Sequence, residues 1–147
     1  MFPECLQPAA PYHTEHWAPI MRENATSVRL CALIVEDEFL VALDLEDAMS
    51  SLGFYVCGVA GTQDRARSLA ISGHPDVVLM DVCLEGGREG IEAARWLREV
   101  CRTEVVFVTG HTDKATLERI HEQVPGALVL PKPVSRQRLA EAVVAAL

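Results

Sequence analysis

Five side chains that can handle phosphate or a metal ion stand directly after short apolar segments of the sequence. Glu36 and Asp37 follow the first segment, Asp81 follows the third, Thr109 the fourth and Lys132 the fifth. An isolated aspartate after an apolar run is more often a helix cap or a solvated turn residue. The presence of the other four groups makes Asp81 a candidate for chemistry. Burying a carboxylate beside a core costs free energy unless a cation, hydrogen bonds or solvent compensate its charge.

The chemistry that these groups favour is phosphoryl transfer assisted by a divalent cation. Three carboxylates at one crevice repel one another and attract a cation, and no His or Cys stands beside them in ligand spacing. Oxygen ligands favour a hard ion, and Mg²⁺ fits best because it accepts few carboxylates and keeps several waters. One carboxylate would attack phosphorus, while the lysine and the threonine hydroxyl would contact the phosphoryl oxygens.

The surrounding sequence alternates short apolar runs with amphipathic stretches. Apolar residues recur at i, i+3, i+4 and i+7 from Leu45 to Leu52, which is typical of one buried helix face, and Gly53 ends this stretch. A weaker pattern of Leu117, Ile120 and Val124 outlines the fourth helix. The other helices are predicted over 62–70, 91–101 and 139–146, and the strands over 30–35, 54–59, 77–80, 105–108 and 127–130.

Five strands alternating with five helices through short loops predict an α/β fold, a doubly wound parallel sheet with helices on both faces. Such sheets bind ligands beyond the carboxyl ends of their strands, where the strand order reverses. Functional groups follow four of the five predicted strands. The second strand ends in Gly58, Val59 and Ala60, without such a group, and is therefore predicted to lie at an edge.

Composition limits the function classes. A chain of 147 residues is enough for one domain, and its formal charge of -8 argues against a nucleic-acid surface. Five cysteines without a C-x-x-C pair are typical of small buried side chains in a reducing cytoplasm, and no apolar run is long enough to span a membrane. We therefore expect a cytoplasmic protein. Residues 1–28, interrupted by Pro3, Pro8, Pro11 and Pro19, are predicted to form a flexible N-terminal arm.

Four motifs, each after a predicted strand, give the chain from residue 29 to 147 a family resemblance. They are Leu33-Ile34-Val35-Glu36-Asp37-Glu38, Val78-Leu79-Met80-Asp81, Val108-Thr109-Gly110 and Leu130-Pro131-Lys132-Pro133. As an ordered set they resemble the receiver (CheY-like) domain of two-component response regulators. The resemblance implies a flavodoxin-like fold with strand order 2-1-3-4-5 and a receiver domain over 29–147.

The resemblance also implies the acceptor and the metal ligands. Asp81 would be the phospho-acceptor, and Glu36, Asp37 and Asp81 would hold Mg²⁺ together with the backbone carbonyl of Cys83. Phosphorylation would add roughly 1.5 to 2 negative charges to Asp81 at neutral pH.

Further roles follow for the other two strand ends. Thr109 would be the switch hydroxyl that moves toward the phosphoryl group, and Lys132 would bond first Asp81 and then that group. The peptide bond before Pro133 is often cis in such domains. The signal would change the face made by the fourth helix, the fifth strand and the fifth helix.

Four positions depart from the common pattern or tune it. Val129 replaces the aromatic residue usual three positions before the lysine, which breaks the usual coupling to the threonine. Gly110 stands where Ala or Ser is commoner. Cys83 and His111 occupy positions that tune the hydrolysis of the acyl phosphate in this family, although an exposed loop residue is the simpler interpretation of His111.

The resemblance implies a single-domain regulator that is not an enzyme beyond its own phosphorylation and dephosphorylation. The donor would be a sensor histidine kinase or a histidine phosphotransfer protein, and the output an altered binding of an unknown downstream protein. A phosphate sink, or a receiver belonging to a hybrid kinase, fits the same motifs. A metal-dependent phosphatase with an aspartyl intermediate normally has a second acid where Cys83 stands. A nucleotide or flavin module needs a phosphate-binding loop where Glu36, Asp37 and Glu38 stand.

Overall fold

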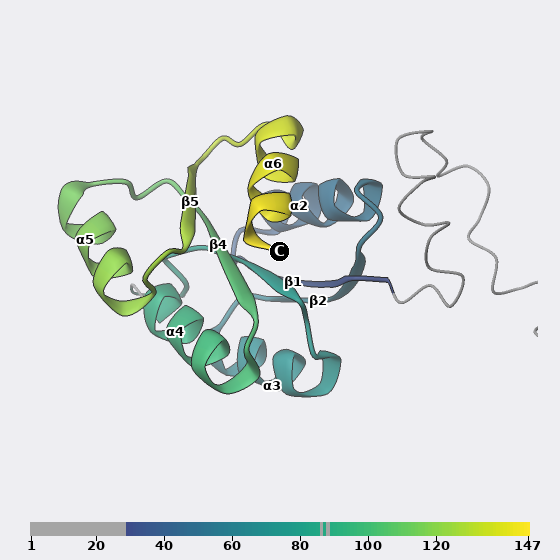
Figure 1. The fold of residues 1–147 in the computed structure, drawn as a ribbon, viewed down its shortest axis with the longest axis horizontal. Helices are drawn as coiled ribbons and strands as arrows, with labels where there is room; N and C mark the ends of the chain where they lie inside the picture. The colour runs from purple at the N-terminus through teal and green to yellow at the C-terminus, as the bar shows by residue number, and fades with distance from the viewer. Residues whose placement is uncertain (1–28, 86, 88) are drawn as a thin grey trace, which may run out of the picture.

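Residues 29–85, 87 and 89–147 are described by a computed structural model, in which five strands form one parallel sheet (Figure 1). The strand order is β2-β1-β3-β4-β5, as the resemblance implied, with β2 at an edge. The predicted arm, residues 1–28, lies outside the described residues. The elements are β1 Cys31–Val35, α2 Phe39–Ser51, β2 Tyr55–Ala60, α3 Gln63–Gly73, β3 Val77–Met80, α4 Glu89–Cys101, β4 Glu104–Thr109, α5 Lys114–Gln123, β5 Leu128–Pro131 and α6 Arg136–Ala146.

The helices cover both faces of the sheet. Helices α2 and α6 pack on one face and α3, α4 and α5 on the other, which gives two separate apolar clusters. The central strands β1 and β3 are buried along their whole length. Because both faces of these strands are buried, their sequences are continuous apolar runs and do not alternate between apolar and polar residues.

The strand and helix boundaries agree with the predictions to within a few residues, but one predicted core position is wrong. Leu117 in α5 is 37% exposed, whereas its neighbour Thr116 is fully buried. The hydroxyl of Thr116 donates to the carboxylate of Asp113, the N-cap of α5, at 2.8 Å. This local bond satisfies a buried polar group, so the helix can turn its threonine inward.

The two aspartates that flank β3 lie at opposite ends of the sheet. Asp76, before the strand, accepts a hydrogen bond from the backbone N–H of Cys31 at 2.7 Å. Its own N–H donates to the carbonyl of Cys31 at 2.8 Å. Asp76 therefore fixes the start of β1 against β3, and only Asp81, after the strand, lies at the carboxyl edge.

No helix among the described residues is both long and apolar enough to cross a membrane.

Candidate functional site

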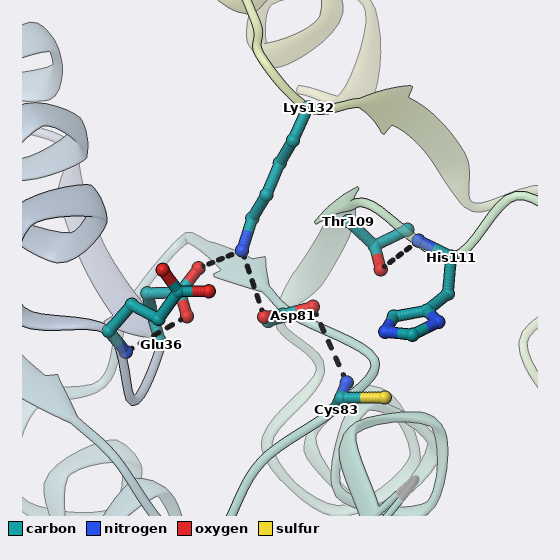
Figure 2. A network of polar contacts seen from close by, with 7 residues as sticks. Glu36, Asp81, Cys83, Thr109, His111 and Lys132 are labelled. Atoms are coloured by element: carbon teal, nitrogen blue, oxygen red, sulfur yellow. Dashed lines mark hydrogen bonds and ion pairs between the residues drawn. The ribbon is translucent and has the colours of Figure 1, made fainter.

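The carboxyl ends of β1, β3 and β5 bring Glu36, Asp81 and Lys132 into direct contact (Figure 2). The Nζ atom of Lys132 lies 3.0 Å from Oδ2 of Asp81 and 2.5 Å from Oε1 of Glu36. Asp81 is 6% exposed and Glu36 is 2% exposed. The peptide bond between Lys132 and Pro133 is cis, as the resemblance implied. Three of the predicted site residues therefore form one compact cluster of charges.

Burial dominates the electrostatics of this cluster. Burial, helped by the negative charge of Asp81, raises the pKa of Glu36 to about 7, although Lys132 and the backbone N–H of Glu38 act in the opposite direction. Burial alone would lower the pKa of Lys132, but its bonds to Glu36 and Asp81 outweigh this effect, so that its pKa is raised. The lysine remains a fixed positive charge between two carboxyl groups.

Three carboxyl groups are placed to hold a hard cation. Glu36, Asp37 and Asp81 each offer an oxygen atom, and these atoms all lie within 4.8 Å of one another. Asp37 is exposed, so an ion can reach the group from solvent. An all-oxygen set with one solvent-facing member suits Mg²⁺, which binds through few carboxylates and retains waters. The donor chemistry therefore fits the ion expected from the sequence.

The strand end of β4 supplies a buried hydroxyl beside the cluster. Thr109 is fully buried, and its Oγ1 accepts a hydrogen bond from the backbone N–H of His111 at 3.1 Å. The His111 side chain is exposed and lines the pocket. On the other side, the backbone N–H of Cys83 donates to Oδ1 of Asp81 at 3.4 Å. Both oxygens of Asp81 are thus oriented, one by Cys83 and one by Lys132.

An open cavity of about 480 Å³ lies over Asp81. Val129, the position without the usual aromatic, is half-buried on β5 and packs against the core cluster under α3, α4 and α5. It does not contribute to the cavity wall. The wall is formed by Asp37, Glu38, Asp81, Cys83, Leu84, Gly87, Gly110, His111 and Lys132.

Sequence reasoning missed one residue that shapes the acceptor loop. Gly90, in the first turn of α4, donates its N–H to the carbonyl of Val82 at 3.0 Å. A Cβ atom at this position would lie 1.9 Å from the carbonyl oxygen of Asp81 and 2.7 Å from that of Val82. Helix α4 can begin against Asp81 and Val82 only because residue 90 has no side chain. The available signal was a glycine nine residues after an aspartate at a strand end, which is weak by itself.

The raised pKa of Glu36 predicts that Mg²⁺ binding weakens as the pH falls through 7. Below the pKa of about 7 the group is increasingly a neutral acid, and a neutral acid is a poor ligand. Calorimetric titration should give an affinity about tenfold lower at pH 6 than at pH 8, from the protonated fraction alone. In the metal-free protein the same shift lowers stability as the pH rises from 4.5 toward about 7, because folding favours the protonated form.

Two variants separate the effect of Glu36 from that of His111, the histidine in the cavity wall. Glu36→Gln should bind Mg²⁺ more weakly and with a flat dependence between pH 6 and pH 8. His111→Asn should keep the dependence of the wild type. A flat profile in His111→Asn, with the slope retained in Glu36→Gln, would assign the effect to the imidazole and contradict the prediction.

Comparisons with known proteins agree on one family. The family model described as the response regulator receiver domain matches residues 32–144. The chain is 36% identical over 94 residues to the phyllosphere-induced regulator PhyR of Methylorubrum extorquens, covering 63% of this chain and 35% of that protein. It is 34% identical over 112 residues to the transcriptional regulatory protein PdtaR of Mycobacterium tuberculosis, covering 76% of this chain and 53% of that protein. The chain thus matches about half of the length of these curated relatives, or less.

A solved structure shows the same fold. The signal receiver domain of a modulated diguanylate cyclase from Desulfovibrio desulfuricans G20 superposes with a TM-score of 0.73 at 33% identity. The match covers 80% of this chain and 93% of that one.

Proposed function

This chain belongs to the response regulator receiver domain family, and from that premise we propose that it is a phosphorylation switch whose acceptor is Asp81. The observation that carries the proposal is the contact of Asp81 with Lys132, next to Glu36 and Asp37, at the base of an open cavity. An anionic nucleophile with a fixed cation on one oxygen is placed to attack an incoming phosphorus atom. We assign the switch to a domain spanning residues 29–147.

The residues act in distinct ways. An oxygen of Asp81 attacks phosphorus, and the bond from phosphorus to the donor's imidazole nitrogen breaks. That nitrogen keeps the electron pair and takes up a proton from solvent, so that the donor leaves as a neutral histidine. Lys132 follows the negative charge from the carboxylate to the phosphoryl oxygens. The hydroxyl of Thr109 turns from the N–H of His111 toward the same oxygens. Glu36, Asp37, Asp81 and the carbonyl of Cys83 would hold Mg²⁺, which would neutralise negative charge on the phosphoryl group.

The partners follow from this chemistry. A phosphohistidine on a sensor kinase or a transfer protein is the phosphoryl donor. The output is the binding of a downstream protein that distinguishes the phosphorylated from the unphosphorylated state. A role as a phosphate sink, or as the receiver of a hybrid kinase, uses the same site and differs only in what the phosphoryl group does next.

Incubation with a small phosphodonor tests the proposal. The protein is mixed with acetyl phosphate, with and without Mg²⁺, and its intact mass is measured at intervals. We expect one phosphoryl adduct that forms only with Mg²⁺ and is lost when water hydrolyses the acyl phosphate. No adduct in the presence of fresh donor and Mg²⁺ would refute the acceptor role.

Lys132→Ala should separate the response to phosphorylation from metal binding. The lysine repels a cation bound to the carboxylates, so its removal should leave Mg²⁺ affinity equal or higher. Without it, the phosphoryl group loses a charge-assisted bond, worth roughly 1.5–3 kcal/mol, and the conformational response should be reduced at equal phosphorylation. Hydrogen exchange of the adduct and of the free protein measures this response. Two results would count against the assigned role. One is a change in hydrogen exchange on phosphorylation that is as large in Lys132→Ala as in the wild type, and the other is a loss of Mg²⁺ affinity larger than the loss of that change.

A further inference from the structure

Two cysteine side chains meet at the end of the sheet opposite the acidic cavity, beneath the C-terminus of α3. Cys31 begins β1 and is 8% exposed, Cys57 lies half-buried on the edge strand β2, and both thiols are free. The Sγ atom of Cys31 lies 3.7 Å from the carbonyl oxygen of Gly73. The Sγ atom of Cys57 would lie 2.9 Å from a Cβ on the same glycine. Both thiols therefore share a space that the missing side chain of Gly73 leaves open, and Cys31 is close enough to Cys57 to affect the pKa of its thiol.

The strand register explains how the two thiols come together. Ala32 pairs with Val56, but Leu33 pairs with Gly58, so Cys57 is an extra residue of β2 level with the gap between Ala32 and Leu33. Cys57 is thus displaced from Cys31 by about one and a half residues, or about 5 Å along the strand and about 5 Å across it. The Cα atoms are then about 7 Å apart, just beyond the roughly 4.4–6.8 Å usual for a disulfide and at the limit above which the backbone must move to close the bond. Without the register shift the separation would be larger still.

We propose that Cys31 and Cys57 are a dithiol that closes into a reversible intrachain disulfide, with hydrogen peroxide as the oxidant. The sulfur of Cys57 attacks a peroxide oxygen, the O–O bond breaks, and the first water leaves with the thiol proton. The sulfur of Cys31 then attacks the sulfenic sulfur of Cys57, the S–O bond breaks, and the second water leaves. Both sulfurs are oxidised by one electron each, and the peroxide is reduced by two electrons.

The surroundings decide which cysteine reacts first and how fast. Cys57 is the more exposed of the two and lies on an edge strand, so the oxidant reaches it first. Burial, with the contact to Cys31, raises the pKa of the Cys57 thiol to about 12, so little thiolate is present at neutral pH. Closure is consequently slow, and the pair responds to prolonged exposure to an oxidant. Once formed, the bond joins the edge strand to β1 and encloses the segment that carries Glu36 and Asp37.

Peroxide treatment followed by peptide mapping tests the proposal on the full chain. A Cys5→Ser background removes the cysteine outside the described residues. The protein is incubated with hydrogen peroxide, the remaining thiols are alkylated, and the chain is digested without reductant. We expect the peptides of Cys31 and Cys57 to be joined within one chain, to separate after dithiothreitol, and to raise Tm while joined. Cys57→Ser and Cys57→Ala should abolish the crosslink, and Cys101→Ser, the matched control, should retain it.

Two outcomes would overturn the proposal. One is a Cys57 that accumulates as sulfinic acid while Cys31 stays alkylatable. The other is a crosslink of either residue with Cys83, Cys101 or a second chain in place of the predicted pair.

Discussion

Asp81→Asn is expected to abolish phosphoryl incorporation from acetyl phosphate, by at least about 100-fold in rate, because the amide is no longer an anionic nucleophile. The substitution preserves the shape of the side chain and an oxygen that can still accept from the N–H of Cys83. The fold should therefore survive, and the far-ultraviolet circular dichroism spectrum should match that of the wild type. Intact mass after incubation with donor and Mg²⁺ measures the loss.

Asp76→Asn is the matched control for Asp81→Asn. Both aspartates flank β3, but the side chain of Asp76 accepts from the backbone N–H of Cys31, which an asparagine oxygen can also do. Asp76→Asn should incorporate the phosphoryl group at the rate of the wild type. Equal losses in both variants would mean that the strand, and not the acceptor, was damaged, and an unchanged rate in Asp81→Asn would place the acceptor elsewhere.

Gly90→Ala is expected to have the largest effect on stability of any single methyl addition to a glycine described in the structure. The added Cβ would lie 1.9 Å from the carbonyl oxygen of Asp81 and 2.8 Å from Cα of Val82. These are backbone atoms, so no side chain can rotate away, and the start of α4 must move from the acceptor loop. Overpacking of a core typically costs about 1–3 kcal/mol, and contacts with backbone belong at the upper end.

A loss of about 3 kcal/mol corresponds to a Tm lower by about 10 °C for a domain of this size. Thermal unfolding measures it, and phosphoryl incorporation should fall as well, because the residues after Asp81 are displaced. Gly110→Ala is the matched control, since no atom lies within 4 Å of an added Cβ there. A Tm of Gly90→Ala equal to that of Gly110→Ala would contradict the packing argument.

The sequence predicted the layered fold because each strand and helix has its own local pattern. The chemistry-bearing residues stand where strands end, and parallel strands place those ends at one edge. The strand order was predicted from the family resemblance. The residues alone predicted only that β2 lies at an edge, because no polar functional group follows it. Local patterns were less informative in α5, where Thr116 is buried with its hydroxyl bonded to Asp113 and Leu117 is exposed.

The features that escaped prediction depend on atoms brought together from distant segments. The pKa of Glu36 is raised mainly by burial, which the side chain acquires only when the chain folds. The need for glycine at position 90 arises from the carbonyl groups of Asp81 and Val82, and the meeting of Cys31 with Cys57 arises from a shift in strand register. None of these features can be recognised from the spacing of residues in the sequence, because each depends on tertiary contacts between distant segments.

The most direct test of the central claim is to find the residue that carries the phosphoryl group. An acyl phosphate is reduced by borohydride to an alcohol, which converts a phosphorylated aspartate into homoserine. We predict that protein treated with acetyl phosphate and Mg²⁺, then with borohydride, contains homoserine at position 81 and aspartate at positions 37 and 76. Homoserine at another position, or a stable adduct on a side chain other than a carboxylate, would contradict the account.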